Sequence, residues 1–214
     1  MPTLLYIADP MCSWCYGFGP ELAALLDGLP GLKLEIVVGG LRAYNTEIMH
    51  DAMKTELMHH WKKVHDISGL PFLDTAIEQP GFVYDTEPAC RAVVAVRTLS
   101  PVAALPAFAA IQHAFYGEGR DVTRGKTLAE LCCPVLRETG TAITAEAFLS
   151  LWSSEKIVLA TQSDFVQCKN WKIDGFPALV LERNGQLDMV TAGYARVETL
   201  VGQMQVLVDH STQQ

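Results

Sequence analysis

The stretch YIADPMCSWCYGFGPELAALLDGL, residues 6–29, decides the fold, because two cysteines separated by two residues lie between two different periodic patterns. Residues 3–8 (TLLYIA) form a short apolar run that ends at an Asp-Pro dipeptide, and such a run predicts a buried strand. From residue 13 to residue 27 the apolar positions recur at helical spacing and stop at Gly28, which predicts a helix. The cysteine pair therefore lies where a strand passes into the start of a helix.

That position determines the chemistry we expect of the pair. Unpaired backbone amides and the helix dipole favour a negative charge at a helix N-terminus. Thiols in such places have a pKa in the range of about 3.5 to 7.5, below the ordinary value of about 8.5, and the thiolate is the nucleophile of disulfide exchange. We assign Cys12 as the nucleophile and Cys15, one helical turn further on, as the resolving thiol. Trp14, between them, would present one ring face to a substrate.

Two other interpretations of the pair are a metal site and two core residues that happen to be close. A structural zinc site needs four ligands, commonly two such pairs, and the other close pair, Cys132-Cys133, is vicinal. Histidines 50, 59, 60 and 65 lie in one polar segment. Such a cluster is usually the solvated face of a helix rather than a metal site. We expect no metal, and the strand and helix on either side argue against a purely structural pair.

The rest of the chain divides into three parts. Residues 32–41 (LKLEIVVGGL) predict a second strand, which completes a βαβ unit and favours parallel pairing. Strand signals are nearly absent from residues 44–154, where helical patterns predict an all-helical block. Those patterns cover residues 47–67, 86–99, 103–116, 127–138 and 144–152. Residues 176–193 (FPALVLERNGQLDMVTAG) then predict a hairpin, and residues 196–209 predict a closing helix.

Composition limits the classes of function and the location. The formal net charge of -8 argues against nonspecific binding of nucleic acid or anionic membranes. No run of eighteen apolar residues occurs, so we expect no membrane-spanning helix. The first ten residues carry no Lys or Arg, unlike a secretory signal, so a chain that starts at Met1 is expected in the cytoplasm. Four of the six cysteines, 90, 132, 133 and 168, are expected to be small buried hydrophobes, with a second redox pair such as Cys132 with Cys168 as the alternative.

Three motifs, in the same order, resemble the DsbA family, and more narrowly its cytosolic FrnE-like branch. They are DPMCSWCYGF (residues 9–18), TEPACRA (86–92) and GFPALVL (175–181). The resemblance covers nearly the whole chain and implies an α/β, thioredoxin-like fold with a large all-helical insertion. Residues 1–43 and 155–214 would form the thioredoxin-like domain, and residues 44–154 the insertion domain. The implied activity is thiol-disulfide oxidoreductase or isomerase, on protein or small-molecule disulfides, without a cofactor other than glutathione as a redox partner.

The resemblance carries over Cys12, Cys15 and Pro177, and it implies a cis peptide bond between Phe176 and Pro177. Bonds to proline are the ones in which the cis form costs little, and a proline that begins a strand removes no interior ladder donor. Phe176 would then present its backbone to an extended substrate, whereas a plain trans turn proline is the alternative. The middle motif supplies weaker candidates near the groove, for which helix capping and solvation are the simpler explanation: Glu87, Pro88 and Arg91.

Two features depart from better-known relatives. The first strand carries no carboxylate, where many thioredoxin-like enzymes have a buried acid beneath the cysteines, so proton handling falls to Asp9, which follows the strand, or to a water. Phe176 also stands before the proline, where small or β-branched residues are common, and would reshape the groove.

Two other functions compete with disulfide exchange. The 2-hydroxychromene-2-carboxylate isomerases and kappa-type glutathione transferases share the inserted helices but generally have a serine at the nucleophile position and use glutathione. The presence of Cys15 argues against them, because a resolving thiol is useless to an isomerase. A binding module for unfolded proteins could use Met49, Met53 and Met58 as an adaptable apolar surface, although core packing explains them equally well. The direction of exchange, the client and the oligomeric state stay open.

Overall fold

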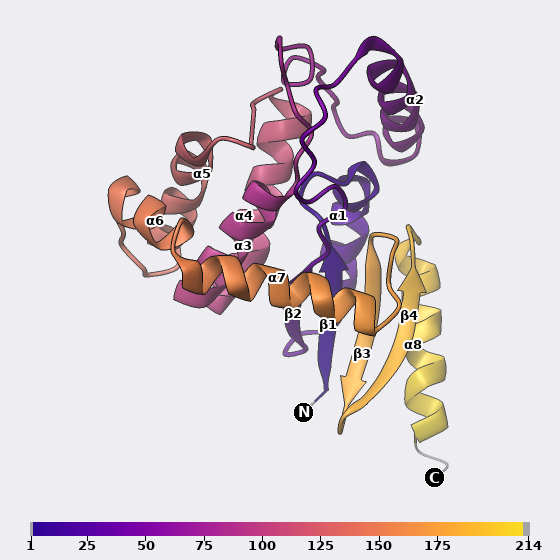
Figure 1. Cartoon of the computed structure of the whole chain (residues 1–214). Coiled ribbons are helices and arrows are strands. Elements are labelled where there is room, and N and C mark those ends of the chain that lie inside the picture. Colours follow the sequence, from indigo (N-terminus) through magenta and orange to yellow (C-terminus); the bar gives the residue numbers. More distant parts are fainter. Residues whose placement is uncertain (1, 212–214) are drawn as a thin grey trace.

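The computed structural model describes residues 2–211 (Figure 1). The first part of the chain forms β1 (Thr3–Ala8), α1 (Ser13–Asp27) and β2 (Lys33–Val38). A series of helices follows: α2 (Asp51–Ser68), α3 (Glu87–Leu99), a 3-10 turn (Pro101–Ala103), α4 (Ala104–Gln112), a π-helix (His113–Gly117), α5 (Gly125–Glu138) and α6 (Ala145–Trp152). The chain continues through α7 (Glu155–Asn170), β3 (Ala178–Arg183), β4 (Gln186–Ala192) and α8 (Val197–Ser211). The predicted β-α-β unit, terminal hairpin and closing helix are confirmed.

The four strands form one sheet in the order β2-β1-β3-β4. β1 and β2 are parallel, whereas β3 is antiparallel to both β1 and β4. All six residues of the central strand β1 are buried, which is why its sequence is continuously apolar rather than alternating. Successive side chains point to opposite faces, so Leu4 and Tyr6 join the main core while Leu5 and Ile7 join a smaller cluster.

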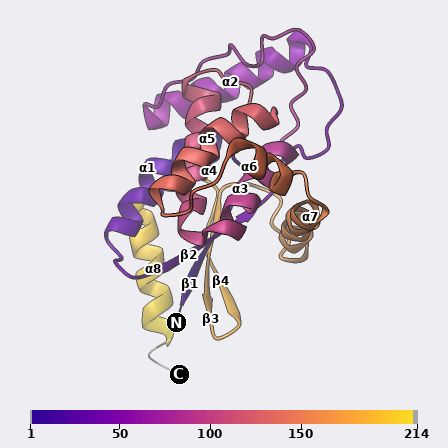
Figure 2. The same ribbon diagram turned by 90° about the vertical axis from the view of Figure 1, so that its left-hand side faces the viewer.

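Helices cover both faces of the sheet. Figure 2 shows α1 and α8 on one side of the strands, α7 on the other, and the helices α2 to α6 gathered beyond one end. The smaller cluster packs Leu5 and Ile7 against Cys168 and Ile173 from α7 and the segment after it. This mixed architecture confirms the predicted α/β fold class. Among residues 2–211, no helix combines the length and apolar character needed to cross a membrane.

The central block differs from the all-helical prediction in two places. α2 begins at Asp51 rather than at residue 47, because Ile48 forms a β-bridge with Val83 and His50 accepts a hydrogen bond from the Met53 N–H as the N-cap. The helix predicted over residues 103–116 is α4 followed by the separate π-helix. The block therefore contains helices and an irregular segment, residues 69–86, in which Val83 pairs with Ile48 ahead of α2.

Side chains from the helices close the free edge of the sheet. β2 is an edge strand, and such strands expose unpaired backbone groups. Asp164 of α7 accepts a hydrogen bond from the Val38 N–H at 2.9 Å, and Arg97 of α3 donates to the Ile36 carbonyl. Arg97 also binds Asp164 through two nitrogens at 2.8 and 3.0 Å. This network attaches α3 and α7 to β2 and holds the C-terminal end of β2 in place.

Candidate active site

Cys12 is the N-cap of α1, at the turn by which β1 passes into the helix. The turn is closed by two hydrogen bonds to Asp9: Cys12 N–H donates to the Asp9 carbonyl at 3.0 Å, and Met11 N–H donates to Asp9 Oδ1 at 2.7 Å. The side chain of Cys12 is 5% exposed, whereas Cys15, one turn further, is completely buried. Both are free thiols in this structure. Of the two residues, Cys12 is therefore the less deeply buried.

The second part of the site comes from the segment before β3. The Phe176–Pro177 peptide bond is cis, and the Cys12 thiol donates to the Phe176 carbonyl at 3.6 Å. The Pro177 carbonyl accepts a hydrogen bond from the Gly193 N–H at 2.7 Å. Trp14 is half-buried, and its ring centroid lies 5.9 Å from that of Tyr194, between β4 and α8. The fold thus brings Cys12 and Phe176, 164 positions apart, into contact.

The surroundings of Cys15 disfavour its thiolate form. Burial raises its pKa well above the ordinary value, and the hydrogen bond and charge of neighbouring Cys12 raise it further. Tyr6, from β1, donates to the Cys15 carbonyl at 3.4 Å, and burial raises the Tyr6 pKa as well. Burial is thus the main cause of the raised pKa of both Cys15 and Tyr6.

Asp9 connects the cysteine turn with the loop that follows β2. Its carboxylate is fully buried; Oδ1 accepts from Met11 N–H, while Oδ2 accepts from Leu41 N–H at 2.7 Å and from the Cys90 thiol at 3.4 Å. Burial raises the pKa of Asp9, and the hydrogen bonds from Leu41 and Met11 oppose that rise. The buried carboxylate of this region therefore lies directly after β1 rather than within it.

A pair of tyrosines contacts the same turn from the helical side. Tyr84 donates to the Met11 carbonyl, and its oxygen lies 3.3 Å from that of Tyr116. Since the single Tyr84 proton is used on Met11, Tyr116 is the donor to Tyr84. Both side chains are buried. Sequence analysis missed this pair because buried tyrosines in apolar segments look like ordinary core residues; a polar hydroxyl with no local partner is the only signal they carry.

The second-tier candidates have structural contacts. Arg91 forms an ion pair with Glu87 at 2.9 Å and lies over the Trp152 ring, 4.0 Å from its centroid. The Trp152 indole donates to the Pro88 carbonyl at 3.1 Å. These residues join α3 to α6, and Cys12 and Cys15 are not among their partners.

The other cysteines are all buried free thiols. Burial raises the pKa of Cys132 and of Cys133, and it raises that of Cys168 to about 12. No group of three or more His, Cys, Asp or Glu side chains within residues 2–211 is placed to hold a metal ion. Of the three methionines considered for a client-binding surface, Met49 is buried and Met53 and Met58 are half-buried against the core.

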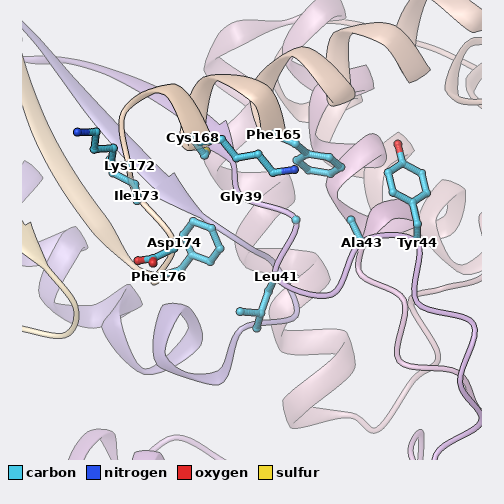
Figure 3. A pocket seen from close by; sticks show the side chains of 12 residues that line it. Gly39, Leu41, Ala43, Tyr44, Phe165, Cys168, Lys172, Ile173, Asp174 and Phe176 are labelled. Carbon is cyan, nitrogen blue, oxygen red and sulfur yellow. The ribbon is translucent and has the colours of Figure 1, made fainter.

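A cavity of about 490 Å³ lies beside Phe176 (Figure 3). Its walls come from the loop after β2, from the C-terminal part of α7 and from the segment before β3. The Phe176 ring occupies the space that a Cβ atom would take at Gly39, and the Phe165 ring does the same at Gly40. The Gly-Gly pair after β2 is therefore what allows both rings to line the cavity.

Comparison with solved structures identifies the fold. The chain is 34% identical to a candidate protein disulfide isomerase from Nitrosomonas europaea, covers 98% of each chain and superposes with a TM-score of 0.85. It is 25% identical to the cytosolic disulfide reductase DsbM from Pseudomonas aeruginosa, covering 98% of this chain and 99% of that one at a TM-score of 0.75. A 2-hydroxychromene-2-carboxylate isomerase shares the fold at 16% identity, with 99% and 98% covered and a TM-score of 0.65. No protein-family model and no curated protein matches the chain.

The mixed sheet with helices on both faces, shared with these solved structures, defines the thioredoxin-like class of fold. Within that class the chain is a member of the DsbA-like family of oxidoreductases, as its motifs predicted.

Proposed function

We propose that this protein catalyses thiol-disulfide exchange through Cys12 and Cys15. The observation that carries the proposal is the position of the Cys12 sulfur, which lies at the start of α1 and 3.6 Å from the Phe176 carbonyl. Helix N-termini in general favour negative charge, and the backbone of Phe176, which lies beside Cys12, is the segment that would align an extended substrate. Cys15 lies one turn behind, as a resolving thiol must.

The exchange takes place in two balanced steps. The Cys12 thiolate attacks one sulfur of a substrate disulfide; a new S–S bond forms, the substrate bond breaks, and the other sulfur leaves as a thiolate. Cys15 then loses its proton and attacks the Cys12 sulfur, which forms the Cys12–Cys15 disulfide and releases the second substrate thiolate. Two electrons pass from the cysteine pair to the substrate, and the reverse sequence oxidises a substrate dithiol.

We assign Asp9 as the group that accepts the proton of Cys15. It is a buried carboxyl in the turn that carries the two cysteines, and burial raises its pKa. Its negative charge raises the pKa of the Cys15 thiol, so the proton transfer relieves an unfavourable interaction between the two groups. A carboxylate with a raised pKa is a stronger base toward a thiol than an ordinary aspartate. Tyr6 and Tyr84, which hold the carbonyls of Cys15 and Met11, orient the two cysteines during the step.

The relatives suggest the direction and partner of exchange. DsbM is described as a cytosolic disulfide reductase and has been solved with glutathione, at 26% identity to this chain. We propose a cytoplasmic enzyme that reduces disulfides and exchanges electrons with glutathione, because a reducing compartment favours the dithiol form.

Single-turnover reaction with glutathione disulfide tests the proposal. The reduced protein should lose two thiols, whereas Cys12→Ser should not react and Cys15→Ser should stop at a glutathione adduct on Cys12, seen by mass spectrometry. Cys133→Ser, at a buried thiol remote in sequence, serves as the control and should behave as wild type. Disulfide-exchange turnover should collapse in Cys15→Ser; glutathione conjugation or isomerisation that survives in that variant would instead favour the glutathione-dependent isomerase or transferase.

A further inference from the structure

The cavity beside Phe176 is formed by parts of the chain that are already fixed in position. Three backbone N–H groups of the loop after β2 donate to side chains from other elements: Leu41 to Asp9 at 2.7 Å, Arg42 to Thr86 at 3.2 Å and Tyr44 to Asp85 at 2.8 Å. The loop therefore does not depend on a ligand for its shape. A volume of about 490 Å³ lies within the range of about 300 to 1,000 Å³ usual for small-molecule sites.

The cavity is connected to the reacting sulfur through Phe176. The ring of this residue lines the cavity, while its carbonyl oxygen accepts the Cys12 thiol. Cys12 itself does not line the cavity, so Phe176 is the residue that touches both the sulfur and the cavity. The interior wall is apolar, with Leu41, Phe165 and Ile173.

Charge at the rim indicates the kind of group the cavity receives. Lys169 and Lys172, at and just after the C-terminal end of α7, line it and are exposed. Neither forms an ion pair with a residue of the described chain, although the protein carries a net charge of -8. Asp174 lies at the same end as Lys172, and Phe165 and Tyr44 lie at the other (Figure 3). Two unpaired ammonium groups beside an apolar wall suit a carboxylate, and Asp174 provides a place for an ammonium.

We propose that this cavity binds the carboxylate-bearing arm of a small peptide-like thiol or disulfide, and that Lys169 and Lys172 select for its charge. The inference rests on the proposed exchange at Cys12 and names the substrate class of that site. The bound arm is the half of the disulfide whose sulfur Cys12 attacks; it is released as a thiol when Cys15 displaces it. A small anionic disulfide is then preferred over a neutral or cationic one.

Three disulfides that differ in charge test the inference: glutathione disulfide, bis(2-hydroxyethyl) disulfide and cystamine. The reduced protein is mixed with each one, and the second-order rate constant for loss of its two reactive thiols is measured. The test variant is Lys169→Glu/Lys172→Glu, with Lys169→Gln/Lys172→Gln as a milder version. The matched control, Lys126→Glu/Lys156→Glu, makes the same change in net charge at exposed lysines outside the cavity.

The charge-reversed cavity variant should react with glutathione disulfide at least tenfold more slowly and with cystamine faster than wild type. Its rate with the neutral disulfide, and all rates of the control, should stay within twofold. Salt at 0.5 M should reduce the difference in rate between the charge-reversed variant and the wild type, because exposed charges are screened. Equal slowing with all three disulfides, no change with any, or the same pattern in the control overturns the inference while exchange itself stands. If the wild type reacts with none of them, the proposed function fails and this inference with it.

Discussion

Tyr84 donates a hydrogen bond to the carbonyl oxygen of Met11, the residue directly before Cys12. The two residues are 73 positions apart, and the contact joins the irregular segment of the helical block to the turn that presents the nucleophile. Tyr116, in the π-helix, supports it through the Tyr84 oxygen. The helical block is therefore in direct contact with the cysteine turn.

Tyr84→Phe should lower the free energy of unfolding by about 1 to 3 kcal/mol, because the Met11 carbonyl becomes a buried acceptor without a donor. Its exchange rate should also fall, since the turn before Cys12 loses an anchor. Denaturant unfolding and single-turnover kinetics measure the two effects. Tyr16→Phe is the control, because the described residues provide no hydrogen-bond partner for the Tyr16 hydroxyl; equal effects of both substitutions would contradict the role given to Tyr84.

Asp9 should contribute more to the free energy of unfolding at low pH than at neutral pH, the reverse of an ordinary ion-paired aspartate. Because its folded-state pKa is raised above the ordinary 3.8, the folded protein binds this proton more tightly than the unfolded chain. The contribution of Asp9 to the free energy of unfolding is thus fully present below about pH 3.8 and is lost as the pH rises through the raised value. Denaturant unfolding of wild type and Asp9→Asn at a series of pH values should show this slope in the difference between them.

The same substitution should also cost stability at neutral pH. Asp9 accepts N–H groups on both oxygens, and an amide NH₂ would face one of those donors, at a cost of about 1 to 3 kcal/mol. A difference curve that is flat from pH 3 to pH 8 would show that Asp9 titrates as it does in the unfolded chain.

Gly39→Ala should displace the Phe176 ring, since the new Cβ atom would occupy its position. We expect a loss of about 1 to 3 kcal/mol of stability and slower exchange with small disulfides. Gly175→Ala is the matched control in the same region, because a Cβ atom there meets nothing within 4 Å. In the Phe176→Ala background the cost of Gly39→Ala should largely vanish; additive costs in this double-mutant cycle would rule out the contact as the cause.

Arg97→Ala should destabilise the protein far more than Arg120→Ala. Arg97 binds Asp164 through two nitrogens and reaches the β2 edge, and its side chain is 26% exposed. Removing it leaves Asp164 and the Ile36 carbonyl poorly paired, at a cost of about 1 to 3 kcal/mol. Arg120, 34% exposed and paired with the 50% exposed Glu130, should contribute less than about 1 kcal/mol. Urea midpoints that shift equally would refute the importance of the edge network.

Prediction from sequence was most accurate where a local pattern suffices. The runs at residues 3–8 and 13–27 became β1 and α1 with the expected bounds, since burial on both faces and helical periodicity are written directly in neighbouring residues. The predicted start of α2, at residue 47, was wrong. The bridge between Ile48 and Val83 competes with helix formation there, and it depends on a segment 35 positions away.

The candidate site divides in the same way. Cys12, Cys15 and Trp14 follow from one motif, and Phe176 and Pro177 were suggested by the family resemblance. Asp9 was named only as one option for proton handling. Its burial and its bonds to Leu41 and Cys90 arise from the packing of β2 and α3 around it, and no spacing in the sequence encodes them.

The sequence by itself determined that a cysteine pair opens a helix after a buried strand, because helix capping and strand burial depend on adjacent residues. Only the tertiary structure decided what surrounds that pair: the Phe176 carbonyl, the Tyr84 hydroxyl and the lysine-rimmed cavity. These groups come from segments far apart in the chain, and their positions follow from how the sheet and helices pack rather than from any local preference.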